Sequence, residues 1–136
     1  MTDIYKEIIM EHYKNPQNKG LMEKADVSAS DTNPNCGDAI TMQLKMENNI
    51  VKEIKFHGHG CAISQAAASM LTEKIKGKNT EEIAKISKEE VLKSLGIEIS
   101  PMRLKCALLC LKVAKSAALA QLGKETKDAE NEFRKE

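Results

Sequence analysis

Three cysteines occur in sequence settings that are suited to metal or sulfur chemistry. Cys36 lies two residues before Asp38 in the turn-forming segment NPNCGD, so its thiol and the carboxylate can point to one place. Cys61 follows two glycines in GHGC and precedes a predicted helix, whose N-terminus stabilises a thiolate through the helix dipole and free N–H groups. Cys106 lies in the first turns of another predicted helix. These residues are our candidates for a reactive site.

If the four groups converge, they form a ligand set of three sulfurs and one oxygen. Such a set can hold Zn²⁺ or an iron–sulfur cluster. The Asp38 carboxylate is informative, because structural zinc sites prefer four sulfur or nitrogen ligands and a hard oxygen binds a soft site more weakly. The ligand set is therefore suited to a metal ion or cluster that is bound for a time and then released. Arg103 and Lys105 flank Cys106 and are candidates for activating its thiolate or steering a partner.

Other interpretations of these residues remain open at this point. Each cysteine alone could be a small buried hydrophobe, and a Cys–His nucleophile pair also fits the spacing. Cys110 follows Cys106 by one helical turn on an apolar stripe, so we expect a core residue, with a spare exchangeable thiol as the alternative. His57 and His59 would share one face of a strand, where we expect exposed side chains, and His59 is an alternate ligand candidate.

A small sheet and several helices must position these residues. Small and polar residues give a weak strand pattern first, alternating apolar residues predict the second strand, and the third strand places Ile50, Ile54 and Phe56 on one face. Asn48-Asn49 suits a hairpin turn, because asparagine tolerates the left-handed conformation. The predicted strands are 25–32, 38–46 and 50–58.

Helical periodicity and end signals surround these strands. We expect Ser64 to cap the helix after Cys61 and Gly77 to end it. A long helix should start at Pro101 and close near Leu122 at Gly123. The other predicted helices are 3–14, one that opens at Thr80, and one that runs from the Ser87 capping box to Gly96. Strands followed by helices indicate an α+β domain over 1–123, with 124–136 as a charged extension that is either helical or frayed.

Composition limits the classes of function. The chain has 136 residues with 21 basic and 20 acidic side chains, a net charge of +1, which argues against nucleic-acid or membrane-surface binding. Four aromatic residues and no tryptophan predict an aliphatic core. Four cysteines are too few for a disulfide scaffold, and we expect no signal peptide and no transmembrane helix. The cysteines should therefore be reduced thiols in a cytoplasmic protein.

The cysteine segments resemble those of the IscU/SufU/NifU-N family of iron–sulfur cluster scaffold proteins. The matching motifs are NPNCGD, GCAIS at 60–64 and KC at 105–106, in the family's order, together with residues 5–20 and AASMLTE at 67–73. The resemblance implies the NifU-N fold, a small antiparallel sheet packed by helices with the site at one end. It also implies Cys36, Asp38, Cys61 and Cys106 as ligands.

The resemblance further implies a function. A pyridoxal-phosphate-dependent cysteine desulfurase would deliver sulfur to Cys36, Cys61 or Cys106, a [2Fe–2S] cluster would form from that sulfur and iron, and Asp38 would assist its release to apo-proteins. SufU-type members instead hold zinc and act as sulfurtransferases, which is the alternative function. A zinc-stabilised interaction module is a second alternative. The sequence leaves open whether the chain forms a homo-oligomer.

Two segments differ from the IscU pattern. IscU proteins usually carry histidine where this chain has Lys105, and 99–103 matches only part of the segment that an Hsp70-type chaperone recognises, so we do not count that chaperone as an expected partner. The segment 101–107 is similar to SufU. However, Cys61 and Cys106 are 45 positions apart, which is close to the IscU spacing and lacks the SufU insertion.

Overall fold

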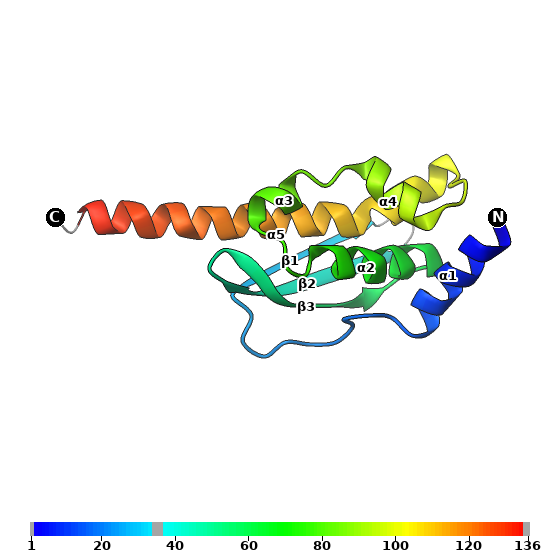
Figure 1. Ribbon diagram of the computed structural model, residues 1–136, viewed down its shortest axis with the longest axis horizontal. Helices are drawn as coiled ribbons and strands as arrows, with labels where there is room; N and C mark the ends of the chain where they lie inside the picture. Colours follow the sequence, from blue (N-terminus) through cyan, green and yellow to red (C-terminus); the bar gives the residue numbers. More distant parts are fainter. Residues whose placement is uncertain (1, 34–36, 135–136) are drawn as a thin grey trace.

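In the part of the chain that the structure describes, three antiparallel strands form a sheet in the spatial order β1-β2-β3 (Figure 1). The computed structural model describes residues 2–33 and 37–134, with side chains over 4–33 and 37–123. The strands are β1 (Val27–Asn33), β2 (Asp38–Glu47) and β3 (Ile50–His59). The helices are α1 (Thr2–Lys14), α2 (Ala62–Ile75), α3 (Thr80–Ala84), α4 (Lys88–Leu95) and α5 (Pro101–Arg134). The predicted α+β class is confirmed.

The strand pairings determine which side chains of the sheet reach the core. The buried apolar residues of β2 and β3 are Ile40, Met42, Leu44, Val51, Ile54 and Phe56. The predicted inward position of Ile50 is wrong, because a bulge between Val51 and Glu53 turns Val51 inward and leaves Ile50 45% exposed. Asn48 and Asn49 form the predicted hairpin turn with φ of 53° and 65°.

Two helices cover one face of the sheet. Helix α2 packs over β3, α5 packs over β1 and β2, and the two helices contact each other (Figure 1). Helix α1 lies against α2, while α3 and α4 pack on α5. The loop after α1 follows the outer edge of β3, where Asn18 and Gly20 form backbone hydrogen bonds with Phe56. The core between these layers is aliphatic apart from Phe56, as predicted.

The helix caps differ in part from the prediction. Cys61, not Ser64, is the N-cap of α2, because its Sγ accepts the backbone N–H of Ser64 at 3.4 Å. Asn79, one residue before the predicted start, caps α3 in a capping box with Glu82. Ser87 caps α4 as predicted.

Helix α5 does not end where the sequence predicts. It continues through Gly123 to Arg134, so the closing role of Gly123 is wrong, and the domain boundary at residue 123 stays a prediction. By length and composition Pro101–Gly123 could cross a membrane. Half of its most apolar window is buried within the fold, however, and the core helix of a soluble protein passes the same test.

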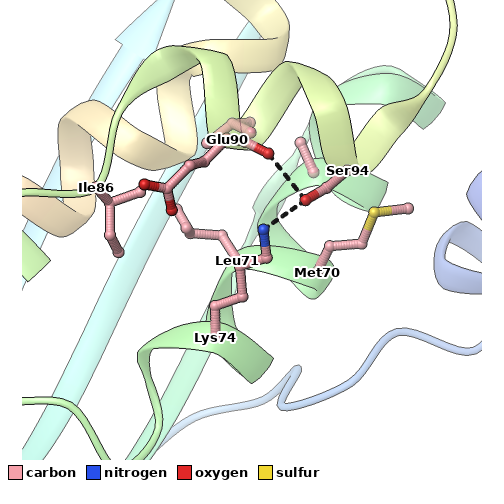
Figure 2. A pocket seen from close by; sticks show the side chains of 8 residues that line it. Met70, Leu71, Lys74, Ile86, Glu90 and Ser94 are labelled. Atoms are coloured by element: carbon pink, nitrogen blue, oxygen red, sulfur yellow. Dashed lines mark hydrogen bonds between the residues drawn. The ribbon is translucent and has the colours of Figure 1, made fainter.

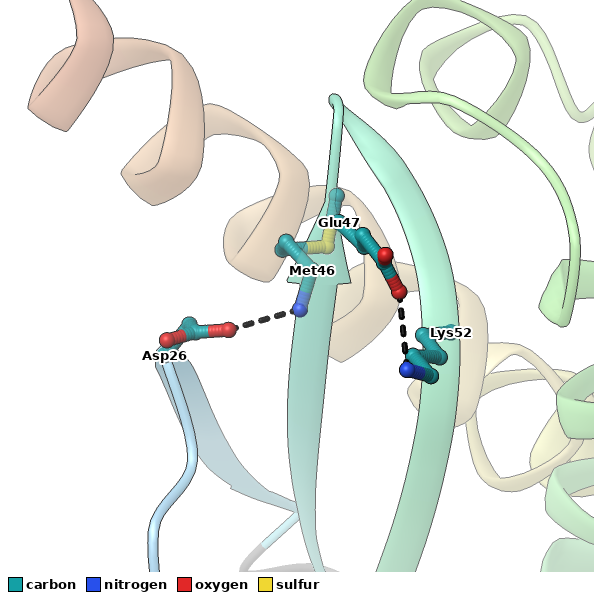
Figure 3. A network of polar contacts seen from close by, with 4 residues as sticks. All are labelled: Asp26, Met46, Glu47 and Lys52. Atoms are coloured by element: carbon teal, nitrogen blue, oxygen red, sulfur yellow. Dashed lines mark hydrogen bonds and ion pairs between the residues drawn. The ribbon is translucent and has the colours of Figure 1, made fainter.

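Polar contacts fix the hairpin end of the sheet (Figure 3). The Asp26 carboxylate accepts the backbone N–H of Met46 at 2.7 Å, which joins the chain before β1 to β2. Lys52 pairs with Glu47 across the hairpin at 2.8 Å, and this hydrogen bond lowers the pKa of the Glu47 carboxyl. This end of β2 is nine residues from Asp38, or about 30 Å along an extended strand. Figure 3 thus shows the end of the sheet opposite to the candidate site.

Candidate metal and sulfur site

The starts of β2, α2 and α5 meet beyond one end of the sheet. Asp38 is the first residue of β2, Cys61 caps α2, and Cys106 lies in the second turn of α5. One carboxylate oxygen of Asp38 and the sulfur atoms of Cys61 and Cys106 all lie within 4.8 Å of one another. Residues that are 23 and 45 positions apart in the sequence thus form one cluster.

The Asp38 carboxylate is buried and only half satisfied. Its side chain is 1% exposed, and its Oδ1 accepts the backbone N–H of Cys61 at 3.0 Å. Its Oδ2 is buried and has no hydrogen-bond partner among the described residues. Because a buried polar atom without a partner is costly, this oxygen is suited to bind a ligand that the chain itself does not supply.

The two described thiols of the cluster have different environments. Cys61 is half-buried, and its Sγ accepts the backbone N–H of Ser64 at the start of α2. Cys106 is 2% exposed, and its Sγ accepts the side-chain amide of Asn33 at 3.8 Å. Cys61 is therefore the more exposed of the two cysteines.

Asn33 is a site residue that the sequence analysis did not single out. Asn33 is the first residue of the NPNCGD motif, ends β1 and lies beside Cys106. The side chain is 8% exposed. The sequence signal that could have found it is the presence of a polar, amide-bearing residue at an inward position of β1, after Val27 and Ala29.

The donor set fits a soft or borderline metal ion. Two thiols and one carboxylate oxygen at this separation match the ligands that Zn²⁺ and iron–sulfur clusters take in proteins. The fourth predicted ligand, Cys36, lies outside the described residues. It precedes Asp38 by two residues in the chain.

The other predicted residues lie around this cluster. Arg103 and Lys105 are exposed on the first turns of α5. His59 is exposed, as expected, whereas His57 is only partly exposed, and the cluster does not include His59. Cys110 is fully buried, as predicted, and burial raises the pKa of its thiol to about 12. Its Sγ donates to the carbonyl oxygen of Ala107 at 3.6 Å. Cys110 is therefore a protonated core residue.

A groove between β1 and α5 lies next to the cluster. It encloses about 470 Å³, and Asn33 lines it and also contacts Cys106. The other lining residues are Thr32, Leu104, Lys105, Leu108, Leu109 and Lys112. The site thus borders an amphipathic surface with two lysines, one of which, Lys112, pairs with Asp31 at 2.8 Å.

A second hollow between α2 and α4 has no role in this chemistry (Figure 2). It holds about 10 Å³, the lower limit for one water molecule. Lys74 donates to the Ser94 hydroxyl at 2.7 Å, and Ser94 donates to the Glu90 carbonyl at 3.0 Å (Figure 2). The first of these bonds joins α2 to α4 across the hollow, so we regard it as a packing feature.

Comparison with known proteins assigns the chain and its fold to a protein family. Residues 4–128 match the family described as the NifU-like N-terminal domain. The zinc-dependent sulfurtransferase SufU of Bacillus subtilis is 37% identical over 90% of this chain and 95% of its own length. The iron–sulfur cluster assembly scaffold protein IscU 1 of Archaeoglobus fulgidus is 41% identical over 68% of this chain and 61% of its own length.

A solved structure shows the same fold. The crystal structure of a protein from Fervidobacterium islandicum, named as an iron–sulfur cluster assembly scaffold protein for the SUF system, superposes with a TM-score of 0.71. It is 30% identical and covers 85% of this chain and 97% of its own. This chain belongs to the NifU-like N-terminal domain family, which includes the IscU and SufU scaffold proteins.

Proposed function

We propose that this protein is an iron–sulfur cluster assembly scaffold that accepts sulfur from a pyridoxal-phosphate-dependent cysteine desulfurase. The observation that carries the proposal is the convergence of Asp38, Cys61 and Cys106 within 4.8 Å, with an unpartnered, buried oxygen on Asp38. Cys36 is proposed as the remaining ligand. The expected cargo is a [2Fe–2S] cluster that passes to apo-proteins, and the expected compartment is the cytoplasm.

The sulfur-accepting step needs a thiolate that an incoming protein can reach. In this step a thiolate of the scaffold attacks the outer sulfur of the desulfurase persulfide. A new S–S bond forms on the scaffold, the S–S bond of the donor breaks, and the desulfurase thiolate leaves with the electron pair. No net oxidation occurs. Cys61 is half-buried, so an incoming protein can reach it more readily than the buried Cys106.

The remaining residues of the site are proposed to bind the cargo, to release it or to favour the contact with a partner. The thiolates of Cys36, Cys61 and Cys106 would hold the cargo, and Asp38 would supply the weaker oxygen ligand that exchanges first on release. The backbone N–H of Cys61 holds one oxygen of that carboxylate in place at 3.0 Å. Arg103 and Lys105, exposed beside Cys106, are proposed to favour its thiolate or to steer the partner.

A zinc-dependent sulfurtransferase of the SufU type is the second candidate. It is favoured by the 37% identity to the Bacillus subtilis protein over nearly the full length of both chains. In that case Zn²⁺ would bind to the same residues and order the site, while the sulfur-accepting step would stay as described above. A zinc-stabilised module that only binds other proteins would use the same ligands without accepting sulfur.

One anaerobic experiment separates these functions. The full-length protein is purified without oxygen, its iron and zinc are measured, and desulfurase, cysteine and Fe²⁺ are then added while the visible spectrum is recorded. Charge-transfer bands of a [2Fe–2S] cluster support the scaffold. Retained zinc with stimulation of the desulfurase, but no such bands, supports the sulfurtransferase. Zinc with neither activity contradicts both functions and leaves the interaction module.

A further inference from the structure

A buried serine hydroxyl near the Asp38 carboxylate has no hydrogen-bond partner among the described residues. Ser64 is the third residue of α2, its side chain is 0% exposed, and its Oγ has no hydrogen-bond partner in the described part of the chain. Serine hydroxyls in helices often bond a carbonyl one turn earlier, and no such bond occurs here. Burying a hydroxyl in this way destabilises the fold. An alanine at this position would avoid that cost.

Gly60 shows how close the hydroxyl and the carboxylate are. A methyl group added to Gly60 would lie 2.4 Å from Asp38 Oδ1 and 3.2 Å from Ser64 Oγ. Both oxygen atoms therefore pack against residue 60, which leaves room for them because it has no side chain. The hydroxyl can donate, and the carboxylate can only accept while ionised. The two groups are chemically complementary.

We propose that Ser64 is a positioning residue for Asp38: its hydroxyl donates to the carboxylate when the site holds metal. Carboxylates that bind metals are themselves held by hydrogen bonds, and loss of such a partner costs 10- to 100-fold in metal affinity. The Cys61 N–H holds Oδ1, and Ser64 supplies a second donor from the first turn of α2. This inference rests on the metal-holding role proposed above and assigns a new residue to it.

Ser64 also contacts a second ligand of the site through its backbone. The backbone N–H of Ser64 already donates to Cys61 Sγ, so one residue would orient two ligands, the sulfur by its backbone and the carboxylate by its side chain. An alanine would keep the first interaction and lose the second. Ser64→Ala thus isolates the side-chain contribution.

The test is a double-mutant cycle on zinc affinity, measured with the full-length protein by competition with a chromophoric chelator. The apo forms of wild type, Ser64→Ala, Asp38→Asn and the double variant are titrated with Zn²⁺. We expect Ser64→Ala to weaken zinc binding about 10-fold in the wild-type background and to have no further effect in the Asp38→Asn background. The apo Ser64→Ala protein should melt at the wild-type temperature or above, because an unpartnered buried hydroxyl has been removed.

A matched control comes from the same helix. Ser69 is also 0% exposed, but its hydroxyl bonds His12 at 2.7 Å and accepts the Gln17 N–H at 2.8 Å, in contact with α1 and the loop after it. Ser69→Ala should lower the melting temperature and leave zinc affinity unchanged. This opposite pattern separates a structural hydroxyl from a positioning one.

Three results would overturn the inference. Unchanged zinc affinity in Ser64→Ala, with a clear loss in Asp38→Asn, would remove the role of Ser64 and leave the metal site intact. An equal loss in both backgrounds would show that the hydroxyl acts on another group, such as Cys61. Unchanged affinity in Asp38→Asn would contradict the proposed metal site itself, and the role of Ser64 with it.

Discussion

Replacing Gly60 by alanine tests how the chain between β3 and α2 holds the Asp38 carboxylate. The added methyl group would lie 2.4 Å from Asp38 Oδ1 and 2.9 Å from its Cγ. Ordinary van der Waals contact begins near 3.4 Å, so the carboxylate must move by about 1 Å. Asp38 is 1% exposed and cannot turn out into solvent without opening the site.

The size of the effect follows from the hydrogen bond that this movement breaks. The Cys61 N–H to Asp38 bond, at 3.0 Å, joins a donor to a charged acceptor, and such bonds contribute about 1.5–3 kcal/mol. We therefore expect Gly60→Ala to lower the free energy of unfolding by about that amount. Misplacement of the carboxylate should also weaken zinc binding at least 10-fold, as loss of a ligand's hydrogen-bond partner does.

Urea unfolding and zinc competition on the same samples provide the assay. Gly123→Ala is the matched control, since a methyl group there meets nothing within 4 Å and lies in the middle of α5. That variant should gain about 0.5–1 kcal/mol of stability and bind zinc like the wild type. Wild-type zinc affinity in Gly60→Ala would refute the view that Gly60 keeps the carboxylate in place.

Four further predictions concern the thiols, the release of a cluster and the end of α4. Burial raises the pKa of Cys110 to about 12, so above pH 9 the unfolded state loses this proton while the folded state keeps it. The free energy of unfolding should therefore fall more steeply with pH in wild type than in Cys110→Ala, by up to about 1.4 kcal/mol per pH unit. Equal slopes in the two proteins would contradict this. Cys61 should react with iodoacetamide in the folded apo protein and Cys110 only after unfolding, as mass spectrometry of the alkylated peptides can show. Asp38→Ala should hold an assembled cluster longer, because the exchangeable oxygen ligand is removed; faster loss of the visible absorbance would count against that role. Gly96→Ala should lower the free energy of unfolding in urea by about 2–3 kcal/mol, since Gly96 has φ of 66° and the methyl group would collide with the Tyr5 ring. A decrease of less than about 1 kcal/mol would contradict this prediction.

The sequence predicted the order and type of the elements, because strong local signals specify them. Two-residue alternation in β2, the Asn48-Asn49 turn and the Ser87 cap each act within a few residues, and each is present as predicted. The same signals bring Asp38 to the start of a strand and Cys61 to the start of a helix. Their meeting with Cys106 depends on packing between distant segments. The prediction that these three residues meet came from the family resemblance and not from sequence periodicity.

The incorrect predictions arose where the conformational preference of a single residue was outweighed by its structural surroundings. Ser64 is the better N-cap by propensity, but the thiol of Cys61 takes that position and leaves the serine hydroxyl inside the site. Gly123 was expected to end α5, yet one glycine costs a helix only about 1 kcal/mol and does not stop it. The bulge in β3 that exchanges Ile50 for Val51 has no sequence signal of this kind.

The central claim is that the thiolates beside Asp38 hold a cluster for transfer while the core thiol does not. Cluster transfer to an apo-ferredoxin measures it most directly, after anaerobic loading with desulfurase, cysteine and Fe²⁺. We predict that wild type and Cys110→Ser load a [2Fe–2S] cluster and pass it on, and that Cys61→Ser and Cys106→Ser do neither. The claim would be contradicted if Cys61→Ser and Cys106→Ser loaded and transferred the cluster as well as the wild type does, or if the wild-type protein formed no cluster.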